Sequence, residues 1–125
     1  MTVEDAGLAA QCFDYQVQNP QLARLIFWEG LELSAPVAEA FRSQRSEAKV
    51  ARLREALPAL SHDHARDLLF TVLTMCDSWQ VLRLMDRVYT GAEARDAARD
   101  AERKRTVVAA VGAIARELLE HPLQP

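Results

Sequence analysis

The stretch "SHDHARD" gathers residue types that bind metal ions, namely His62, Asp63, His64 and Asp67. Imidazole and carboxylate groups can share a zinc ion when they lie about one turn apart on one face of a helix. His64 and Asp67, three residues apart, meet that spacing. The same residues also suit the start of a helix, where Ser61 caps the first turn and Asp63 lies at the positive end of the dipole. A metal-dependent helical-bundle enzyme is therefore one hypothesis, although we predict no bound metal.

Catalysis by other means finds no support in the sequence. No nucleophile is paired with a base, and no glycine-rich loop is present that would cradle a phosphate. We predict that the chain is not an enzyme and that it uses no cofactor.

The stretch "NPQLARLIFWEGLEL" (residues 19–33) points instead to the binding of a small molecule. Its large apolar residues occur on most sides of a helix, with Phe27 and Trp28 near the centre. Ligand pockets are mostly apolar, and aromatic rings supply large apolar area, but ordinary core packing uses the same residues. Gly30 costs about 1 kcal/mol of helix stability relative to Ala. That cost predicts a close neighbour, either another backbone or a bound molecule.

A second apolar stretch, residues 61–89, carries more apolar residues than contact with one core requires. Asp77 interrupts it, and a buried carboxylate is costly unless it is paired. Asp77 therefore faces solvent, pairs with an arginine across a dimer, or lines a polar corner of a pocket, and the three alternatives remain open. Met adapts to irregular ligands. The predicted ligand-binding residues are Phe27, Trp28, Phe70, Met75, Asp77 and Trp79.

Five helical segments position these residues, and no run of β-branched residues alternates as a strand would, so the fold class is predicted as all-α. Asn19 caps the second segment, with Pro20 at its first position. Pro58 ends the third, and Thr90 with Glu93 forms a capping box for the fifth. The segments are expected over residues 3–18, 19–33, 35–57, 61–89 and 90–122.

The composition describes one ordinary soluble domain, expected to span residues 1–125. Half of the 125 residues are hydrophobic and 26% are charged. The net charge of -3 does not favour nucleic acid binding by electrostatics. No apolar run approaches the ~20 residues that span a bilayer, and the acidic start "MTVEDAG" is not a signal peptide. We predict a cytoplasmic protein with no membrane partner, in which Cys12 and Cys76 are free thiols.

The end of the chain suggests self-association. The stretch "TVVAAVGAIARELLEH" carries apolar residues at coiled-coil-like spacing, and its small residues permit close approach of another helix. The last two predicted helices thus have more apolar surface than a monomer needs, and a two-fold interface between copies would cover it as a four-helix bundle. The predicted dimer-interface residues are Val107, Val111, Gly112, Ile114 and Leu118.

Together these stretches resemble the C-terminal regulatory domain of tetracycline-repressor (TetR) family transcription regulators. The resemblance rests on "NPQLARLIFWEGLEL", the charged helix after it, "ARDLLFTVLTMCDSWQVLRLM" and the final "RTVVAAVGAIARELL". It implies an all-helical bundle, a homodimer built on the last two helices, and a pocket for a small apolar effector of unknown identity. In the family, effector binding alters the DNA affinity of the protein, which is allosteric coupling.

The family's N-terminal helix-turn-helix domain has no counterpart in these residues. The chain enters the regulatory region soon after Met1, so either that domain has been removed or the gene encodes a short form. DNA binding is expected only through the missing domain. The alternative hypothesis is a stand-alone helical adaptor that dimerises and binds no small molecule.

Overall fold

The computed structural model describes residues 3–93 and 95–121, and side chains from Gly7 onward. This part of the chain forms six helices and no strand, which confirms the predicted all-α class. The helices are α1 (Val3–Gln18), α2 (Pro20–Glu32), α3 (Glu39–Ala56), α4 (His62–Val81), α5 (Arg83–Thr90) and α6 (Ala97–Glu120).

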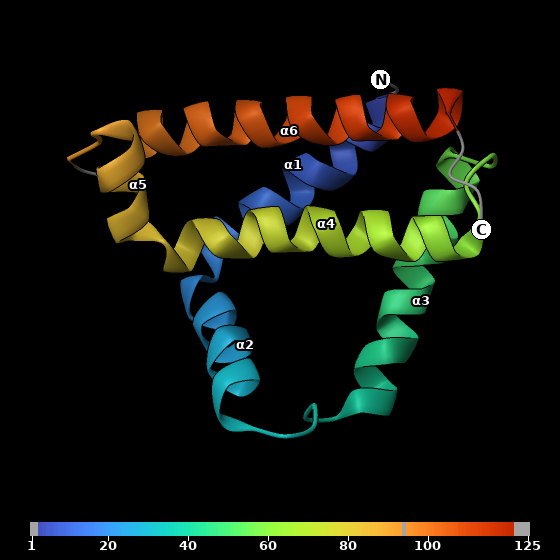
Figure 1. Cartoon of the computed structure of the whole chain (residues 1–125), viewed down its shortest axis with the longest axis horizontal. Helices are drawn as coiled ribbons and strands as arrows, with labels where there is room; N and C mark the ends of the chain where they lie inside the picture. The colour runs from blue at the N-terminus through green and yellow to red at the C-terminus, as the bar shows by residue number, and fades with distance from the viewer. Residues whose placement is uncertain (1–2, 94, 122–125) are drawn as a thin grey trace.

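The helices divide into a packed layer and a projection (Figure 1). Helix α1 packs against both α4 and α6, and α5 bridges the ends of α4 and α6. Helices α2 and α3 leave the same side of α4 and are joined by residues 33–38. We call α1, α4, α6 and residues 50–56 of α3 the body, and residues 24–47 the arm.

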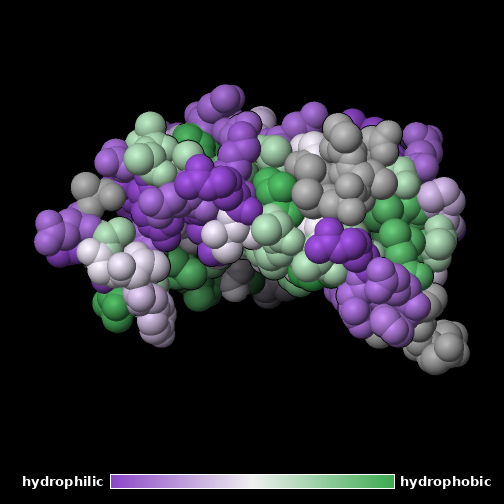
Figure 2. Space-filling model, turned by 90° about the horizontal axis from the view of Figure 1, so that it is seen from above, coloured by the Kyte–Doolittle hydropathy of each residue, from purple (hydrophilic) through white to green (hydrophobic). Residues whose placement is uncertain are grey.

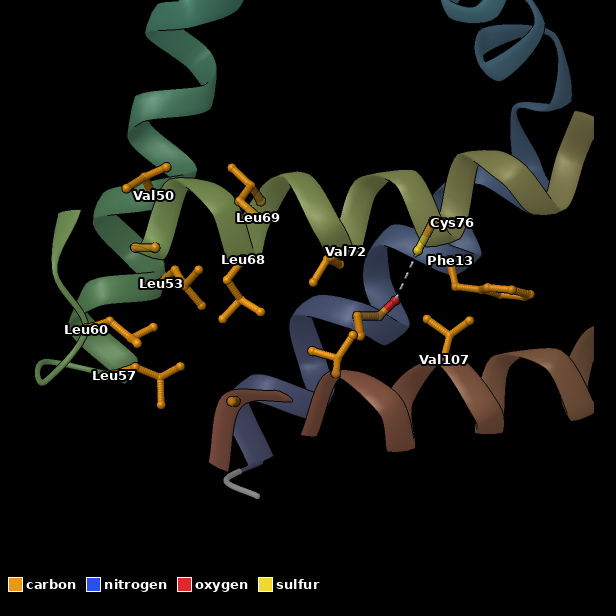
Figure 3. Close-up of a cluster of buried hydrophobic side chains, with 14 of the residues drawn as sticks. Phe13, Val50, Leu53, Leu57, Leu60, Leu68, Leu69, Val72, Cys76 and Val107 are labelled. Atoms are coloured by element: carbon orange, nitrogen blue, oxygen red, sulfur yellow. Dashed lines mark hydrogen bonds between the residues drawn. The ribbon is translucent and has the colours of Figure 1, made fainter. Parts of the chain in front are cut away.

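One apolar cluster holds the body together (Figure 3). Phe13 of α1, Val72 of α4 and Val107 of α6 are buried at its centre, and Val50 and Leu53 of α3 extend it. Their helical spacing puts each apolar stripe on one face, as amphipathic helices require. At about 25 cal/mol per Å² of apolar surface, this burial is the main favourable term in folding. The body therefore accounts for the stability of the chain.

The predicted single helix over residues 61–89 is wrong, because the chain bends by 88° between α4 and α5. Leu82 leaves helical geometry, with φ of -102° and ψ of 41°. The turn brings Asp86 of α5 inward, where it bonds to Arg99 of α6. No single helix among the described residues is long and apolar enough to cross a membrane; α4 and α5 would reach that limit only together, across their bend.

Two helix starts also differ from the expectation. Helix α6 begins after Asp96, whose side chain accepts from the Arg99 amide, and not at Thr90. Thr90 ends α5 instead, and Gly91 follows in the left-handed conformation with φ of 74°, a common helix stop. The predicted end at Pro122 lies outside the described residues. Helix α3 begins at Glu39, after Ala38 in the left-handed region at φ of 50°.

The start of α2 is confirmed at Pro20, but the close neighbour expected at Gly30 is not found within the chain. A Cβ built on Gly30 meets nothing within 4 Å. Asn19 does not cap α2 with its side chain, since its amide donates to the Tyr15 carbonyl at 2.9 Å. The arm is thus an open structure around its glycine.

Candidate functional site

The arm exposes large apolar side chains along its whole length. Phe27 and Trp28, two of the predicted ligand-binding residues, are 41% and 53% exposed. Helices α2 and α3 each pack on α4 and show no mutual packing comparable to those contacts. Isolated surface hydrophobics are ordinary, but a continuous set marks a binding surface. The exposed set is Leu25, Phe27, Trp28, Leu31, Leu33, Val37 and Phe41.

A polar clip fixes the tip of the arm. Arg42 of α3 donates to both carboxylate oxygens of Glu29 of α2, at 2.8 and 2.9 Å. The same carboxylate accepts from the Val37 amide at 3.1 Å, and Arg42 also donates to the Val37 carbonyl at 3.0 Å. These hydrogen bonds lower the pKa of Glu29. Helices α2 and α3 are therefore held apart at a set spacing without apolar packing between them.

The predicted ligand-binding residues on α4 do not converge on one cavity. Phe70 is 65% exposed, whereas Met75 is half-buried and packs against the core cluster. Trp79 is buried beside Phe13, with ring centroids 6.3 Å apart. The sequence pattern correctly indicated that Phe70, Met75 and Trp79 are apolar residues of a helix. Their side chains point in different directions around α4, so they do not form one site.

Trp79, predicted as a ligand contact, is engaged inside the chain instead. Its indole N–H donates to Asp100 at 2.9 Å, and the Arg95 guanidinium carbon stacks 3.3 Å from the ring centroid. Arg99 lies 4.9 Å from the same ring and bonds to Asp86 at 2.7 Å. Cation–π contact and a charge-assisted hydrogen bond act together here. This cluster fixes the bend between α4, α5 and α6.

Asp77 lies on α4 next to Cys76, where α4 packs on α1; we call this place the junction. The residue is only 8% exposed, and its Oδ1 has no hydrogen-bond partner among the described residues. Burial raises the pKa of Asp77, while the nearby Lys49 ammonium of α3 opposes the rise. Gln16 of α1 is 6% exposed, and its Oε1 is likewise unpartnered. Of the three alternatives for Asp77, solvent exposure is therefore wrong.

The two cysteines of this junction are free, and neither is activated. Burial raises the pKa of Cys76 to about 12 and also raises that of Cys12. The Cys76 thiol lies 4.0 Å from the Ala9 carbonyl (Figure 3). Thiolates are the reactive form, so these thiols act as small apolar groups at this place.

Three of the residues predicted for the dimer interface lie inside the chain's own core. Val107 and Val111 are 1% and 3% exposed, and Gly112 is also buried. Ile114 and Leu118 are half-buried and pack against the same cluster. Coiled-coil-like spacing is satisfied equally well by packing on α1 of the same chain. The outward face of α6 carries Ala101, Ala109 and Ala113 instead.

The start of α4, which carries the histidine cluster, makes polar contacts with Glu47 of α3. His62 and Arg66 each approach Glu47 at 2.7 Å, and Ser61 caps the helix by accepting from the His64 amide. Within the described residues, no group of three or more His, Cys, Asp or Glu side chains could hold a metal ion. The open groove beside it, of about 480 Å³, is lined by Glu47, Ala51, Arg54, Glu55, Pro58 and His62.

One gap in the apolar core is too small to hold a ligand. That gap lies between α1, α3, α4 and α6 and has no room for a water molecule. It is lined by Leu8, Leu53, Leu57, Leu68, Val72, Val111 and Ala115. The large exposed apolar side chains of this part of the chain are therefore found on the arm and not around this gap.

Sequence reasoning missed Gln16, whose Oε1 is buried without a partner among the described residues, and Lys49, whose charge opposes the rise in the pKa of Asp77. Gln16 follows Phe13 by three residues and Ala9 by seven, so it lies on the buried stripe of α1. That spacing was the available signal. No comparable signal identified Lys49, because it lies in a highly charged helix, and charged residues of such a helix are usually expected to face solvent.

Comparison with known proteins agrees with this architecture. A family model described as "Tetracyclin repressor-like, C-terminal domain" matches residues 5–112. A similar relative, the HTH-type transcriptional repressor SCO4008 of Streptomyces coelicolor, is 32% identical over 96 residues. That alignment covers 68% of this chain and 47% of the relative, so the chain spans about half of that protein's length. No solved structure matches the chain. The chain belongs to the family of tetracycline-repressor-like C-terminal domains, which are parts of transcription regulators.

Proposed function

We propose that this chain is the effector-binding and dimerising domain of a TetR-like transcriptional repressor. The main support for this proposal comes from the arm. Its seven large apolar side chains are exposed, and its two helices stand apart. A small apolar effector bound between α2, α3 and α4 would cover these side chains. DNA would be read by a helix-turn-helix domain of the parent protein, by analogy with the Streptomyces relative, an HTH-type transcriptional repressor.

Effector binding would act through the arm because the arm has little packing of its own. Segments with few buried contacts open most easily, and a ligand shifts an equilibrium by its differential affinity for the two states. Closure of α2 and α3 on a ligand would move the ends of α1 and α4, to which α2 is attached. In the alternative hypothesis, a helical adaptor without a small-molecule ligand, the same surface would bind a protein partner. This alternative is supported by the gap in the core, which is too small for a water molecule.

Dimerisation is proposed through the outward faces of α6 and α4. Helix α6 exposes Ala101, Ala109 and Ala113 at spacings of eight and four residues, so they share a face. Phe70 is the large apolar residue exposed on α4. Figure 2 shows hydrophobic residues reaching the surface among hydrophilic ones on the side that carries α6. Pairing two such faces buries small and apolar groups together, as in four-helix bundles.

A thermal-shift screen with apolar small molecules tests the effector site. A ligand that binds only the folded state raises the melting temperature in proportion to the logarithm of its concentration. A positive compound should quench or shift the fluorescence of Trp28, and Trp28→Ala should reduce its affinity about tenfold. Leu84→Ala on α5, also highly exposed, is the matched control and should leave affinity unchanged. A broad panel without any stabilising compound would favour the adaptor.

Sedimentation tests the interface. Ala109→Glu should convert a dimer to a monomer, because two like charges would face each other across the two-fold axis. Ala51→Glu, at an alanine of α3 that is also exposed, should leave the dimer intact. A wild-type chain that sediments as a monomer at all tested concentrations contradicts the dimer.

A further inference from the structure

The arm keeps apolar side chains uncovered on both of its helices, although only residues 33–38 separate them (Figure 1). Trp28 of α2 is 53% exposed, and Phe41 of α3 is 61% exposed. Every residue from Leu31 to Arg45 is exposed, so no other described part of the chain covers the tip of the arm. The hydrophobic effect favours contact between such surfaces. A contact that opposes this collapse is therefore needed to keep α2 and α3 apart.

The clip at the tip of the arm is the contact that spans the space between the two helices. The Glu29 carboxylate of α2 accepts from Arg42 of α3 at 2.8 and 2.9 Å. The same pair holds both backbone groups of Val37, because the Val37 amide donates to Glu29 at 3.1 Å and its carbonyl accepts from Arg42 at 3.0 Å. Charge-assisted hydrogen bonds are stronger than neutral ones. The clip therefore fixes α2, α3 and their connection as one unit.

The face of α2 that carries the clip has apolar surface to cover. Leu25 lies four residues before Glu29, so both side chains share the face of α2 that is turned toward Arg42 of α3. Leu25 is nevertheless 61% exposed. The clip holds α3 at a distance at which it leaves this leucine uncovered.

The backbone next to Val37 is strained, and the clip holds it in place. Ala38 lies in the left-handed region with φ of 50° and ψ of 47°, and within residues 3–93 and 95–121 it is the one residue other than glycine with positive φ. This conformation is unfavourable for a residue with a Cβ atom and persists only where neighbouring contacts fix it. Ala38 precedes α3 and supplies no side-chain cap for it. The arm thus keeps its open form against both apolar attraction and backbone strain.

We propose that Glu29, Arg42 and Ala38 are positioning residues that hold the arm open, so that an effector meets an apolar surface that has not closed on itself. The inference rests on the effector site proposed above. When the clip is broken, α2 and α3 turn toward each other and cover part of their apolar side chains. The apparent affinity for an effector then falls with the fraction of molecules that remain open. Preorganisation of this kind raises affinity without adding a contact to the ligand.

The test changes Ala38, which belongs neither to the exposed apolar set nor to the clip. Ala38→Gly removes the cost of the left-handed conformation, whereas Ala38→Val increases it, because a β-branched residue is a rare outlier there. Fluorescence titration of the whole chain with the neutral apolar probe N-phenyl-1-naphthylamine measures affinity. Ala38→Val should bind this probe about fivefold more weakly than wild type, which is the factor that the left-handed cost implies.

Two matched variants control for the added side chain and for the glycine. Ala38→Gly should bind the probe at least as tightly as wild type, and its Val37 amide should exchange with deuterium more slowly. Ala40→Val places the same side chain two residues later, inside α3 and at an exposed position, and should leave the affinity unchanged.

Two spin labels measure the form of the arm without any ligand. The exposed positions Glu32→Cys and Gln44→Cys place one label on each helix, outside the clip. The distance between the labels should shorten in Ala38→Val and in Arg42→Gln, and it should keep its wild-type value in Ala38→Gly. The chain without the two added cysteines, treated with the same reagent, gives the background from the native thiols. A purely structural role of the clip would lower the free energy of unfolding and leave this distance unchanged.

The remaining outcomes are also decisive. Tighter binding by Ala38→Val overturns the proposal, because the clip would then hinder closure on the ligand. A label distance that stays the same in both Ala38→Val and Arg42→Gln overturns it as well, and so does an unchanged affinity when the distance shortens; the effector site stands in these cases if wild type binds the probe. A wild-type chain that binds no probe contradicts the effector site, and the label distance then decides the role of the clip. Circular dichroism checks that each variant folds, and Arg42→Gln gives the decision if Ala38→Val does not.

Discussion

The body and the arm contain similar apolar residues, but the body buries them and the arm exposes them to solvent. Phe13 in the body is 2% exposed, whereas Phe41 in the arm is 61% exposed. The body packs its apolar residues into one cluster between α1, α3, α4 and α6, while the arm leaves two helices apart, linked by charge at Glu29 and Arg42. The difference shows that apolar content alone does not locate a core. The buried apolar residues that stabilise the chain lie in the body, whereas the arm is the region for which we propose binding.

The comparison is tested most strongly by a matched pair of phenylalanines. Phe13→Ala should lower the free energy of unfolding by about 3–5 kcal/mol, since it removes a buried ring and leaves a cavity. Phe41→Ala should change it by no more than about 0.5 kcal/mol, as expected for an exposed position. Urea unfolding followed by circular dichroism measures both. Equal losses for the two variants would mean that the arm is packed in solution.

The second prediction concerns the charged cluster that closes the body at its bend. Asp86 is buried and accepts from Arg99 at 2.7 Å and from the Thr90 hydroxyl at 3.0 Å. Asp86→Asn should cost about 3–5 kcal/mol, because removal of one partner leaves buried guanidinium groups uncompensated. The exposed Asp63→Asn, on the neighbouring helix, is the control and should stay within about 0.5 kcal/mol.

The same variant has a defined pH signature. The hydrogen bond from Arg99 lowers the pKa of Asp86 below its ordinary value. A carboxyl whose pKa is lowered by folding stabilises the protein above its unfolded pKa, about 3.9, and loses this contribution as pH falls through the folded pKa. The stability gap between wild type and Asp86→Asn should therefore be full at pH 6 and shrink below pH 4. A gap that stays constant into acid contradicts the ion pair as its source.

The predictions for Phe13 and Asp86 concern two parts of the fold that differ in how well the sequence predicted them. Helical periodicity placed every helix of the body, because apolar stripes on α1, α4 and α6 have few other ways to be buried. It failed at residues 82–96, where the deciding contacts join Asp86 to Arg99 and Trp79 to Asp100 across the bend. Contacts between charged residues far apart in sequence leave no periodic signal. A continuous helix was therefore the simplest prediction from the apolar pattern.

The candidate site was likewise predicted only in part from the sequence. The apolar character of residues 19–33 was evident from the sequence, and the choice between pocket and core was left open for Phe27 and Trp28. Their exposure depends on whether α3 returns to cover α2, and that is decided by residues 33–38. Val107 and Val111 were predicted from their coiled-coil-like spacing to lie in a dimer interface; in this chain they are buried in its own core, where α6 packs on α1. Periodicity identifies a buried face and does not identify what covers it.

The smallest expected effect belongs to the clip at the tip of the arm. Glu29→Gln removes the charge that holds Arg42 and the acceptor of the Val37 amide. Global stability should hardly change, since exposed ion pairs contribute little, but the Val37 amide should exchange with deuterium faster. Glu39→Gln, an exposed carboxylate of α3 outside the clip, should leave that exchange rate as it is. If Glu29→Gln instead lowered stability as much as a body substitution, the arm would be part of the cooperative core, and the separation between a stable region and a binding region would fail.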